Sequence, residues 1–322
     1  MTASPIVLLH TDVPEASLDI VQRRHGDLQL HSCDSYAALP AALQQTRAEV
    51  VYSVRFDGTP AFPREALLQA DHVKWISVGG SGTDHLQPWQ PQQVTVTNAA
   101  GVAADMMAEY ALGCLLSFRL QLREFHVLQL EQRWQPDSVT PVAGSTALLI
   151  GLGQTGCAVA RRFKALDLTV LGVRARPQST PHVDEVHGLD ALPQLLPRAD
   201  VIVCAVPLLD STRALLASDE FALTQPHAIL IDVSRGGVVD ETALLNALEQ
   251  GRIQAAALDV FATEPLPGGH PFWGMSNVIV TPHCSSVYPD WELRSVEMFV
   301  DNLDRYRKGQ RLDRVVDPAR GY

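Results

Sequence analysis

Three charged residues, each placed after an apolar run of strand-like composition, could bind a small acid and exchange a proton with it. They are Arg235, Glu264 and His283, and the runs are residues 229–234, 258–261 and 278–282. In open α/β sheets, ligands bind beyond the carboxyl ends of the strands. A guanidinium there can hold the carboxylate and the carbonyl oxygen of a 2-oxo acid. A histidine paired with a carboxylate can deliver its proton to a developing alkoxide.

Each of the three also has an ordinary structural explanation when taken alone. Arg235 could form an ion pair at a helix cap, Glu264 could be a loop charge before a proline, and His283 could be a hydrogen-bonded core histidine. The histidines show no HExxH or paired ligand spacing, so we expect no metal. A shared function therefore depends on a fold that brings the three together.

A glycine-rich loop predicts a dinucleotide site. An apolar strand runs into Gly151-Leu152-Gly153-Gln154-Thr155-Gly156, which is followed by helix-forming residues 157–166. Gly151 permits a tight turn, Gly153 lets the backbone approach a pyrophosphate, and Gly156 lets helix and strand pack closely. The amino end of the helix then offers N–H groups to the phosphates. A chance turn is the alternative, but the flanking strand and helix favour a cofactor loop.

The next strand bears on which nicotinamide dinucleotide is bound. It ends in Arg174-Ala175-Arg176, where an NAD site would carry an acidic residue for the ribose 2′-hydroxyl. Guanidinium groups at that place favour a 2′-phosphate, with Arg174 the nearer candidate and Arg176 assisting. We therefore expect NADP(H) in preference to NAD(H). A solvated basic loop, or an arginine that merely accompanies NAD, is the alternative.

The elements that must position these residues alternate between strands and helices. We expect strands at 146–151, 168–174, 201–206, 228–233, 255–260 and 278–282, and helices at 154–166, 189–196 and 240–250. Continuous Val, Ile, Leu and Ala runs alternating with helices imply a parallel sheet covered on both faces. This pattern is an α/β, doubly wound domain of the Rossmann type.

The flanking segments predict a second α/β region. Apolar runs in the first hundred residues lie at 6–10, 50–54, 72–78 and 94–97. Residues 105–134 lack proline and repeat apolar residues at helical spacing, which predicts one long helix. A surface connection is expected at 135–145, and a last helix at about 288–308 with Gly309 after its end. With 322 residues, the chain is long enough for two domains, each with its own core.

Composition restricts the partners. The chain has a formal net charge of −11 and a pI near 5.4, which disfavours nucleic acid and anionic membranes because both bind basic faces. Five scattered cysteines without a CxxC pair suit a reducing compartment. The first residues lack the features of a signal peptide, and no apolar run approaches the roughly 18 residues of a membrane span. We expect a cytoplasmic protein.

Several motifs together resemble those of the D-isomer-specific 2-hydroxyacid dehydrogenases, in the same order along the chain. They are VSRGGVVDE at 233–241, LDVFATEPLP at 258–267, TPH at 281–283, and Val206-Pro207-Leu208 with Ser211-Thr212-Arg213. The resemblance implies a flavodoxin-like substrate domain from residues 1–98 and 284–322 and a Rossmann cofactor domain from residues 99–283. It also implies a homodimer through the long helix from Asp105, for which a buried intrachain helix is the alternative.

The same resemblance implies a role for each matched residue. Arg235 would bind substrate, His283 would be the acid/base, and Glu264 would orient the histidine. The backbone N–H groups of the loop Val78-Gly79-Gly80 would hold the substrate carboxylate, since glycines let amides approach an anion. Besides the glycine loop and the two arginines, cofactor contacts are implied for Val206, Pro207, Thr212, Val233, Ser234, Asp259 and His283.

These expectations combine into one activity, the transfer of a hydride between NADP(H), or NAD(H), and a small D-2-hydroxy or 2-oxo acid. The chain would be similar in kind to the glyoxylate/hydroxypyruvate reductases. A corepressor-like protein that senses dinucleotides without turnover is the alternative, and a formate or phosphite dehydrogenase is less favoured. Candidates for the side-chain pocket, each also explicable as core or surface, are Arg55, Phe56, Trp273 and Trp291.

Overall fold

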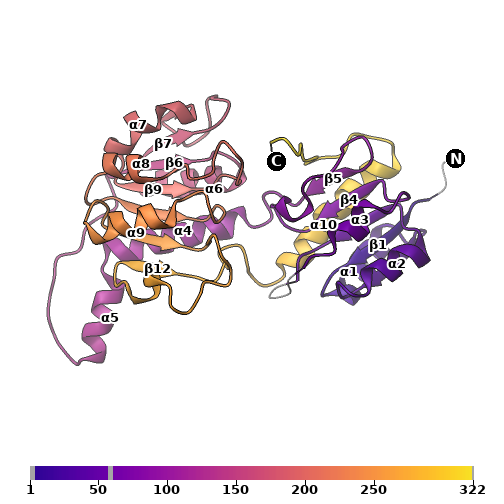
Figure 1. Cartoon of the computed structure of the whole chain (residues 1–322), viewed down its shortest axis with the longest axis horizontal. Helices are drawn as coiled ribbons and strands as arrows, with labels where there is room; N and C mark the ends of the chain where they lie inside the picture. The colour runs from indigo at the N-terminus through magenta and orange to yellow at the C-terminus, as the bar shows by residue number, and fades with distance from the viewer. Residues whose placement is uncertain (1–3, 57–60, 321–322) are drawn as a thin grey trace. The chain divides into compact units, whose positions relative to one another are not determined.

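The computed structural model describes residues 4–56 and 61–320, and the chain divides into two compact units (Figure 1). One unit comprises Met1–Val102 and Tyr288–Tyr322, and the other comprises Ala103–Val287. We call them the terminal unit and the central unit. The chain crosses between the units at 102/103 and at 287/288. Each crossing lies four residues after the division expected from the sequence, at 98/99 and 283/284.

The terminal unit is built on a five-stranded parallel sheet with the strand order β2-β1-β3-β4-β5. The strands are β1 (Ile6–His10), β2 (Gln29–Cys33), β3 (Val50–Ser53), β4 (Trp75–Val78) and β5 (Thr95–Asn98). The helices are α1 (Pro14–Arg24), α2 (Leu39–Thr46), α3 (Arg64–Leu68), the 3-10 turn η1 (Asp84–Leu86) and α10 (Trp291–Arg307).

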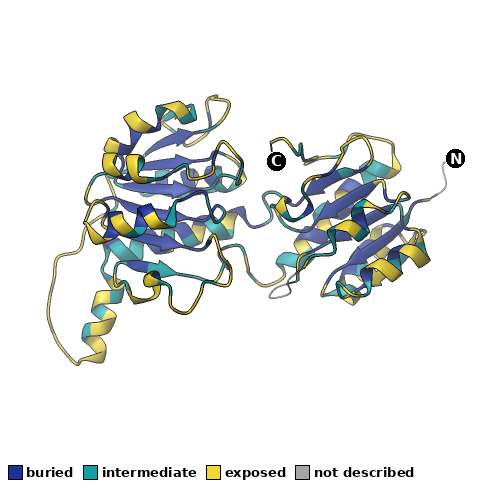
Figure 2. Cartoon of the chain, viewed as in Figure 1, coloured by how far each residue is buried: buried dark blue, intermediate teal, exposed yellow. Residues whose placement is uncertain are grey.

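Two apolar layers cover this sheet, one on each face. Successive side chains of a strand point to opposite faces, so continuous apolar strands need cover on both. One layer holds Leu8, Val51 and Ile76 together with apolar residues of α2. The other holds their sequence neighbours Leu9, Tyr52 and Trp75 against α10. The last helix of the chain therefore completes the core of the first sheet, and Figure 2 shows these strands buried between partly exposed helices.

The central unit is built on a seven-stranded parallel sheet with the strand order β12-β11-β10-β9-β6-β7-β8. The strands are β6 (Thr146–Ile150), β7 (Thr169–Val173), β8 (Glu185–His187), β9 (Val201–Cys204), β10 (Ile229–Asp232), β11 (Ala255–Leu258) and β12 (Val278–Val280). The chain order reverses between β6 and β9, and this switch point is where α/β sheets bind dinucleotides. The expected doubly wound α/β fold is confirmed.

The helices of the central unit cover both faces of this sheet, except the second of them, which buries none of its residues. They are α4 (Ala104–Arg119), α5 (Leu122–Leu130), α6 (Gln154–Lys164), α7 (Leu192–Leu195), α8 (Ser218–Leu223) and α9 (Glu241–Glu249). Short 3-10 turns add η2 (Leu189–Ala191), η3 (Leu196–Arg198) and η4 (Pro271–Gly274). The helix expected at 189–196 is therefore a single α-turn between two 3-10 turns, with a proline near the start of α7 and another near the start of η3.

The single long helix expected at 105–134 is wrong, because it ends at Arg119 and α5 starts at Leu122. Between them Gln121 has a left-handed backbone with φ of 51°. The connection after α5 bonds to the end of α4, since the N–H of Thr140 donates to the carbonyl of Arg119 at 2.9 Å. Gln121 also donates from its side chain to the carbonyl of Ser138. A tertiary contact thus ends a helix that the local sequence would continue.

Two strands were not predicted from the sequence, and both lie at the edges of their sheets. β2 pairs only with β1, and its burial pattern is mostly exposed. β8 has three half-buried residues at the far edge of the central sheet. An edge strand with polar side chains carries no continuous apolar run, so composition does not reveal it.

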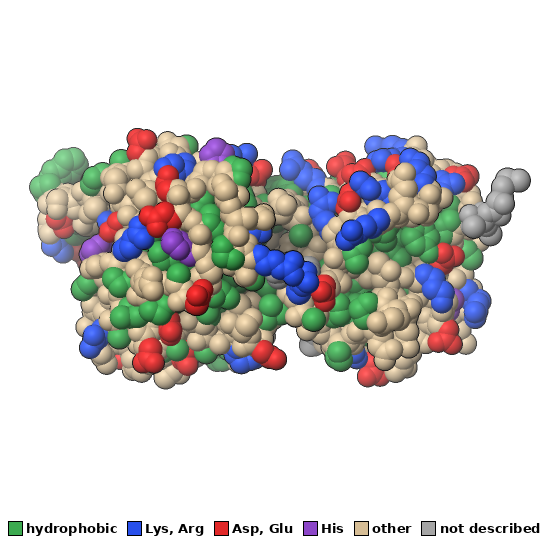
Figure 3. Space-filling model, turned by 90° about the horizontal axis from the view of Figure 1, so that it is seen from above, with side chains coloured by type: hydrophobic (Ala, Val, Ile, Leu, Met, Phe, Trp, Pro, Cys, Tyr) green, Lys and Arg blue, Asp and Glu red, His purple; other side chains and the backbone are tan. Residues whose placement is uncertain are grey.

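The surface carries charges of both signs. Figure 3 shows acidic and basic side chains on the visible faces of both units. Within the described residues, no helix has the length and apolarity that crossing a membrane requires.

Candidate active site

The glycine-rich loop joins β6 to α6 at the switch point of the central sheet. Gly151 has φ of 104°, and a Cβ there would lie 2.4 Å from the carbonyl oxygen of Ala205. A Cβ on Gly156 would lie 1.9 Å from the carbonyl oxygen of Gly151, so only glycine lets the helix begin so close to the loop. A Cβ on Gly153 would meet nothing within 4 Å. That open space at the amino end of α6 fits the approach of a pyrophosphate.

The other loop residues differ in what they can offer a cofactor. Leu152 is buried, with its side chain against Gly172 of β7, so it can contribute only backbone groups. Gln154 and Thr155 begin α6, and Gln154 is exposed. Thr155 donates its hydroxyl to the sulfur of Met107 on α4.

Arg174 follows β7 directly and lies close to the first turn of α6. Its backbone N–H donates to the carbonyl of His187 in β8 at 3.0 Å. Burial raises the pKa of the Cys157 thiol on α6, and the positive charge of Arg174 opposes that rise. Arg174 is half-buried and Arg176 is exposed. A cation therefore stands near the first turns of α6.

The loop after β9 is shaped by the hydroxyl of Thr212. This buried side chain donates to the carbonyl of Pro207 at 2.6 Å and accepts from the N–H of Leu209 at 2.8 Å. The side chain of Val206 lies next to Gly151. Thr212 is therefore bonded within its own loop, and Val206 borders the glycine-rich loop.

The fold brings the loops of Arg235 and Glu264 together at the carboxyl edge of the central sheet. β10, β11 and β12 are parallel neighbours, and Arg235, Glu264 and His283 follow them in that order. A Cβ on Gly236 would lie 1.9 Å from the carbonyl oxygen of Phe261, so the two loops touch through their backbones. Arg235 is half-buried and donates from Nη1 to the carbonyl of Ser234 at 2.7 Å.

Glu264 and His283 form a direct pair. Nδ1 of His283 lies 2.8 Å from Oε2 of Glu264, and the side chains are 34% and 36% exposed. The other carboxylate oxygen, Oε1, accepts from the N–H of Phe261 at 2.9 Å, which fixes the plane of the carboxylate. With Nδ1 bonded to the carboxylate, Nε2 is the ring nitrogen that can meet a substrate.

Asp259 holds the loop that carries His283. This fully buried carboxylate accepts from the hydroxyl of Thr281 at 2.7 Å, from the N–H of Cys284 at 2.9 Å and from the N–H of Ser285 at 3.0 Å. The bonds enclose His283, whose φ of 52° is left-handed. The resemblance implied a cofactor contact for Asp259, and the structure adds that both of its oxygens accept hydrogen bonds from the histidine loop.

Tyr110 extends this network, although nothing in the sequence around it pointed to a function. Its hydroxyl lies 2.7 Å from that of Thr281, so α4 is tied to the histidine loop. Burial raises the pKa of Tyr110. The only sequence signal was a polar aromatic residue within an otherwise apolar helix face, which is too common to suggest a function.

A buried carboxyl also ends β10. Oδ1 of Asp232 accepts from the N–H of Ser234 at 2.9 Å, and burial raises the pKa of Asp232 to about 7. Val233 and Ser234 are buried as well, so their side chains support the turn before Arg235. Any cofactor contact from this segment would use backbone groups.

The substrate-binding loop expected in the terminal unit follows β4. Val78 ends the strand, and Gly79 donates its N–H to the carbonyl of Ser53 at 3.0 Å. A Cβ on Gly79 would lie 2.6 Å from the hydroxyl of Tyr52, so glycine is required there. A Cβ on Gly80 would meet nothing within 4 Å, which leaves its backbone approachable.

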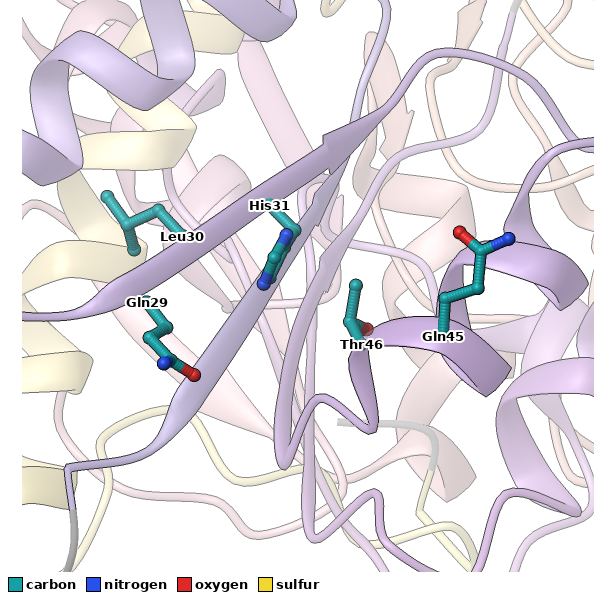
Figure 4. Close-up of a pocket in the computed structure, with 5 residues that line it drawn as sticks. All are labelled: Gln29, Leu30, His31, Gln45 and Thr46. Atoms are coloured by element: carbon teal, nitrogen blue, oxygen red, sulfur yellow. The ribbon is translucent and has the colours of Figure 1, made fainter.

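The remaining candidates for the side-chain pocket, and the hollow on the surface, show no link to the residues described above. Phe56 packs against His10 and Tyr36, with ring centroids 4.8 and 4.9 Å apart, and Trp273 donates to the carbonyl of Pro267. Arg55 is exposed and Trp291 begins α10. Figure 4 shows a hollow between β2 and the end of α2, lined by Gln29, Leu30, His31, Gln45 and Thr46, none of them a predicted site residue. The described residues contain no group of three or more potential metal ligands.

Comparison with known proteins gives consistent matches over nearly the whole chain. A model of the NAD binding domain of the D-isomer specific 2-hydroxyacid dehydrogenases matches residues 112–285. The chain is 31% identical to glyoxylate/hydroxypyruvate reductase A of Serratia proteamaculans, covering 81% of this chain and 85% of that protein.

Two solved structures are similar throughout. A protein of this family from Aeromonas salmonicida is 30% identical with a TM-score of 0.86, and covers 98% of this chain and 100% of its own. Another, from Xanthobacter autotrophicus Py2 in complex with NADPH and MES, is 30% identical with a TM-score of 0.83, covering 99% and 100% of the two chains.

Proposed function

The chain belongs to the D-isomer specific 2-hydroxyacid dehydrogenases, and on that basis we propose its substrate, its cofactor preference and the role of each site residue. It is an NAD(P)-dependent oxidoreductase of small 2-hydroxy acids. We propose that it acts as a reductase of short 2-oxo acids such as glyoxylate and hydroxypyruvate, with NADPH preferred over NADH. The relatives reported above are reductases and dehydrogenases, and none supports a corepressor without turnover.

The bond between Glu264 and His283 is the observation that carries this proposal. When bound, the reduced nicotinamide supplies a hydride to C2 of the acid. His283 gives the proton on Nε2 to the carbonyl oxygen, and Glu264, 2.8 Å from Nδ1, stabilises the charged imidazole and fixes the ring. Arg235 binds the acid and stabilises the negative charge that develops on its oxygen. The N–H of Gly80 binds the carboxylate, since the N–H of Gly79 is already bonded to Ser53.

A substrate panel tests the activity directly. Purified protein is mixed with NADPH or NADH and with glyoxylate, hydroxypyruvate or longer 2-oxo acids, and the absorbance of the reduced nicotinamide is followed. We expect turnover with the two short acids and a higher kcat/KM with NADPH. Absence of turnover with every acid would contradict the proposed function, and turnover only with formate or phosphite in the oxidative direction would assign a different enzyme of this fold.

Replacing Arg174 with Ala should weaken the use of NADPH selectively. We expect the KM for NADPH to rise roughly 10- to 100-fold, because a hydrogen bond to a charged group contributes about 1.5–3 kcal/mol. The KM for NADH, which has no 2′-phosphate, should change less than threefold and serves as the control within the same variant. Equal changes for both cofactors would show that Arg174 does not read the 2′-phosphate.

We propose that the protein is a homodimer through the segment Leu122–Val139. Helix α5 buries none of its residues, and residues 131–141 are all exposed (Figure 2). Several large apolar side chains of the segment are exposed: Leu122 at 52%, Val127 at 52%, Leu130 at 71%, Trp134 at 99% and Val139 at 46%. A cluster of this kind on a monomer marks an interaction site. A second copy is the partner that the family resemblance implies.

The double substitution Leu130→Ser and Trp134→Ser should produce a monomer. Light scattering after size exclusion should give twice the mass of one chain, 35.1 kDa, for the parent and a single mass for the variant. The exposed Trp273, outside the segment, provides the matched control, and Trp273→Ser should stay dimeric. A monomeric parent protein would rule the proposal out.

A further inference from the structure

The substrate loop of the terminal unit is held from behind by a buried chain of hydroxyl groups. Tyr52 of β3 donates from its hydroxyl to the Oγ of Ser295 at 3.0 Å, and Ser295 donates to the carbonyl oxygen of Gly79 at 2.6 Å. Tyr52 is fully buried and Ser295 is 1% exposed. Because the serine oxygen accepts one bond and donates the other, Tyr52 sets the direction in which the serine proton points.

The next two carbonyls of the loop are tied down as well. The carbonyl of Gly80 accepts from the N–H of Ala99 at 2.9 Å, and that of Ser81 accepts from the side chain of Asn98 at 2.7 Å. Three successive peptide groups, beginning at Gly79, therefore have their oxygens bonded to neighbouring parts of the same unit. The side chains that hold these oxygens, directly or through Ser295, come from β3, β5 and α10.

Each tied carbonyl orients the amide that follows it. In a trans peptide the C=O and the next N–H point in opposite directions. Fixing the oxygens of Gly79, Gly80 and Ser81 therefore fixes the N–H groups of Gly80, Ser81 and Gly82, each of which points away from the carbonyl of its own peptide. Within the described part of the chain, no residue accepts a hydrogen bond from these three N–H groups. Unpaired backbone N–H groups are donors that an anion such as a carboxylate can use.

We propose that Ser295, oriented by Tyr52, is the positioning residue that turns the Gly79–Gly80 peptide so that the N–H of Gly80 faces the substrate carboxylate. Ser295 touches neither substrate nor cofactor and acts through the peptide. This inference rests on the proposed function, which has the loop bind a carboxylate. It also explains why α10, the last helix, returns to the first sheet of the chain, since it delivers a buried donor to the loop.

Ser295→Ala should weaken the binding of the acid without weakening that of the cofactor. Alanine removes the donor to Gly79 and adds no bulk, so the peptide is no longer held in one orientation. We expect the KM for glyoxylate and the inhibition constant of oxalate, a two-carbon dicarboxylate, to rise about tenfold. The dissociation constant of NADPH, measured by its fluorescence, and kcat at saturating acid should change less than twofold.

Ser17→Ala is the matched control. Ser17 is a fully buried serine of the same unit, on α1, and its hydroxyl has no hydrogen-bond partner among the described residues. This variant loses a buried hydroxyl without touching the loop, so it reports the effect of the loss on stability alone. If Ser295→Ala raises the KM for glyoxylate no more than Ser17→Ala does, Ser295 is merely structural and the proposal fails.

Tyr52→Phe tests the chain of hydroxyls itself. It removes the donor to Ser295, so the KM for glyoxylate should rise by a smaller factor, about threefold. Adding Tyr52→Phe to Ser295→Ala should cause no further rise, because both act through one hydrogen bond to Gly79. Multiplied effects in the double variant would show that Tyr52 and Ser295 act separately and would overturn the relay.

A measurement without turnover separates this inference from the proposed function. In ¹⁵N-glycine-labelled parent protein, oxalate should shift the amide resonances of Gly80 and Gly82. In Ser295→Ala the same shifts should require a concentration of oxalate about tenfold higher. Gly80→Ala assigns the Gly80 signal, since its Cβ would enter open space. A protein that binds oxalate here but reduces no acid would contradict the proposed function alone. A protein that turns over with unshifted Gly80 and Gly82 would contradict the inference alone.

Discussion

His283→Asn should lower kcat for glyoxylate reduction by roughly 10²- to 10⁴-fold, the range that a positioned general acid contributes. Asparagine keeps a polar side chain of similar size near Glu264 but holds no transferable proton. The affinity for NADPH, followed by fluorescence, should stay within a factor of three. Steady-state and single-turnover rates measure the loss, and single-turnover data assign it to the chemical step rather than to product release.

His227 provides the matched control for His283. Its Nε2 lies 2.7 Å from Oδ1 of Asp200, so it is also a histidine paired with a carboxylate. The two residues precede β10 and β9, at the amino edge of the sheet, opposite the site. His227→Asn should leave kcat within a factor of two. A similar loss in both variants would mean that histidine–carboxylate pairs matter for folding rather than for proton transfer.

Arg235→Lys should lower kcat/KM for glyoxylate by roughly 10²- to 10³-fold, the cost of losing one preorganised donor to a developing oxyanion. Lysine keeps the positive charge but lacks the planar fork that binds two oxygens at once. The bond from Arg235 to the carbonyl of Ser234 would also be lost, so the side chain would no longer be held over the turn. The inhibition constant of oxalate should rise in parallel, because oxalate presents the same pair of oxygens.

Arg252→Lys is the corresponding control, an exposed arginine just before β11 at the amino edge of the sheet. It should leave kcat/KM within a factor of two. An Arg235→Lys enzyme with kcat/KM close to the parent value would show that a simple positive charge suffices, and that the fork binds no substrate oxygen.

Much of the central unit could be predicted because its strands are buried on both faces. Continuous apolar runs marked β6, β7, β9, β10, β11 and β12, and each lies within the range expected for it. The glycine spacing at 151–156 was informative for a related reason. Glycine is required at positions 151 and 156 because a Cβ there would collide with neighbouring backbone atoms.

The edges and breaks could not be predicted, because they depend on contacts distant in sequence. β2 and β8 have few apolar residues and exist as strands only because a neighbouring strand offers hydrogen bonds. At the end of α4, the carbonyl of Arg119 accepts from the N–H of Thr140. Helix propensity carries no information about this contact, because the two residues are joined by an irregular surface connection. Residue types were therefore sufficient for the buried elements and insufficient for those defined by pairing alone.

The sequence by itself determined the chemistry of this protein: a guanidinium, a carboxylate and an imidazole after three apolar strands, and a glycine loop with arginines where a cofactor would be read. Only the tertiary structure decided how those groups are held. Asp259 and Thr281 enclose the left-handed His283, and Ser295 reaches Gly79 over a separation of 216 residues. The physical reason is that residue type fixes what a side chain can donate or accept, whereas its partner and direction depend on how distant segments pack.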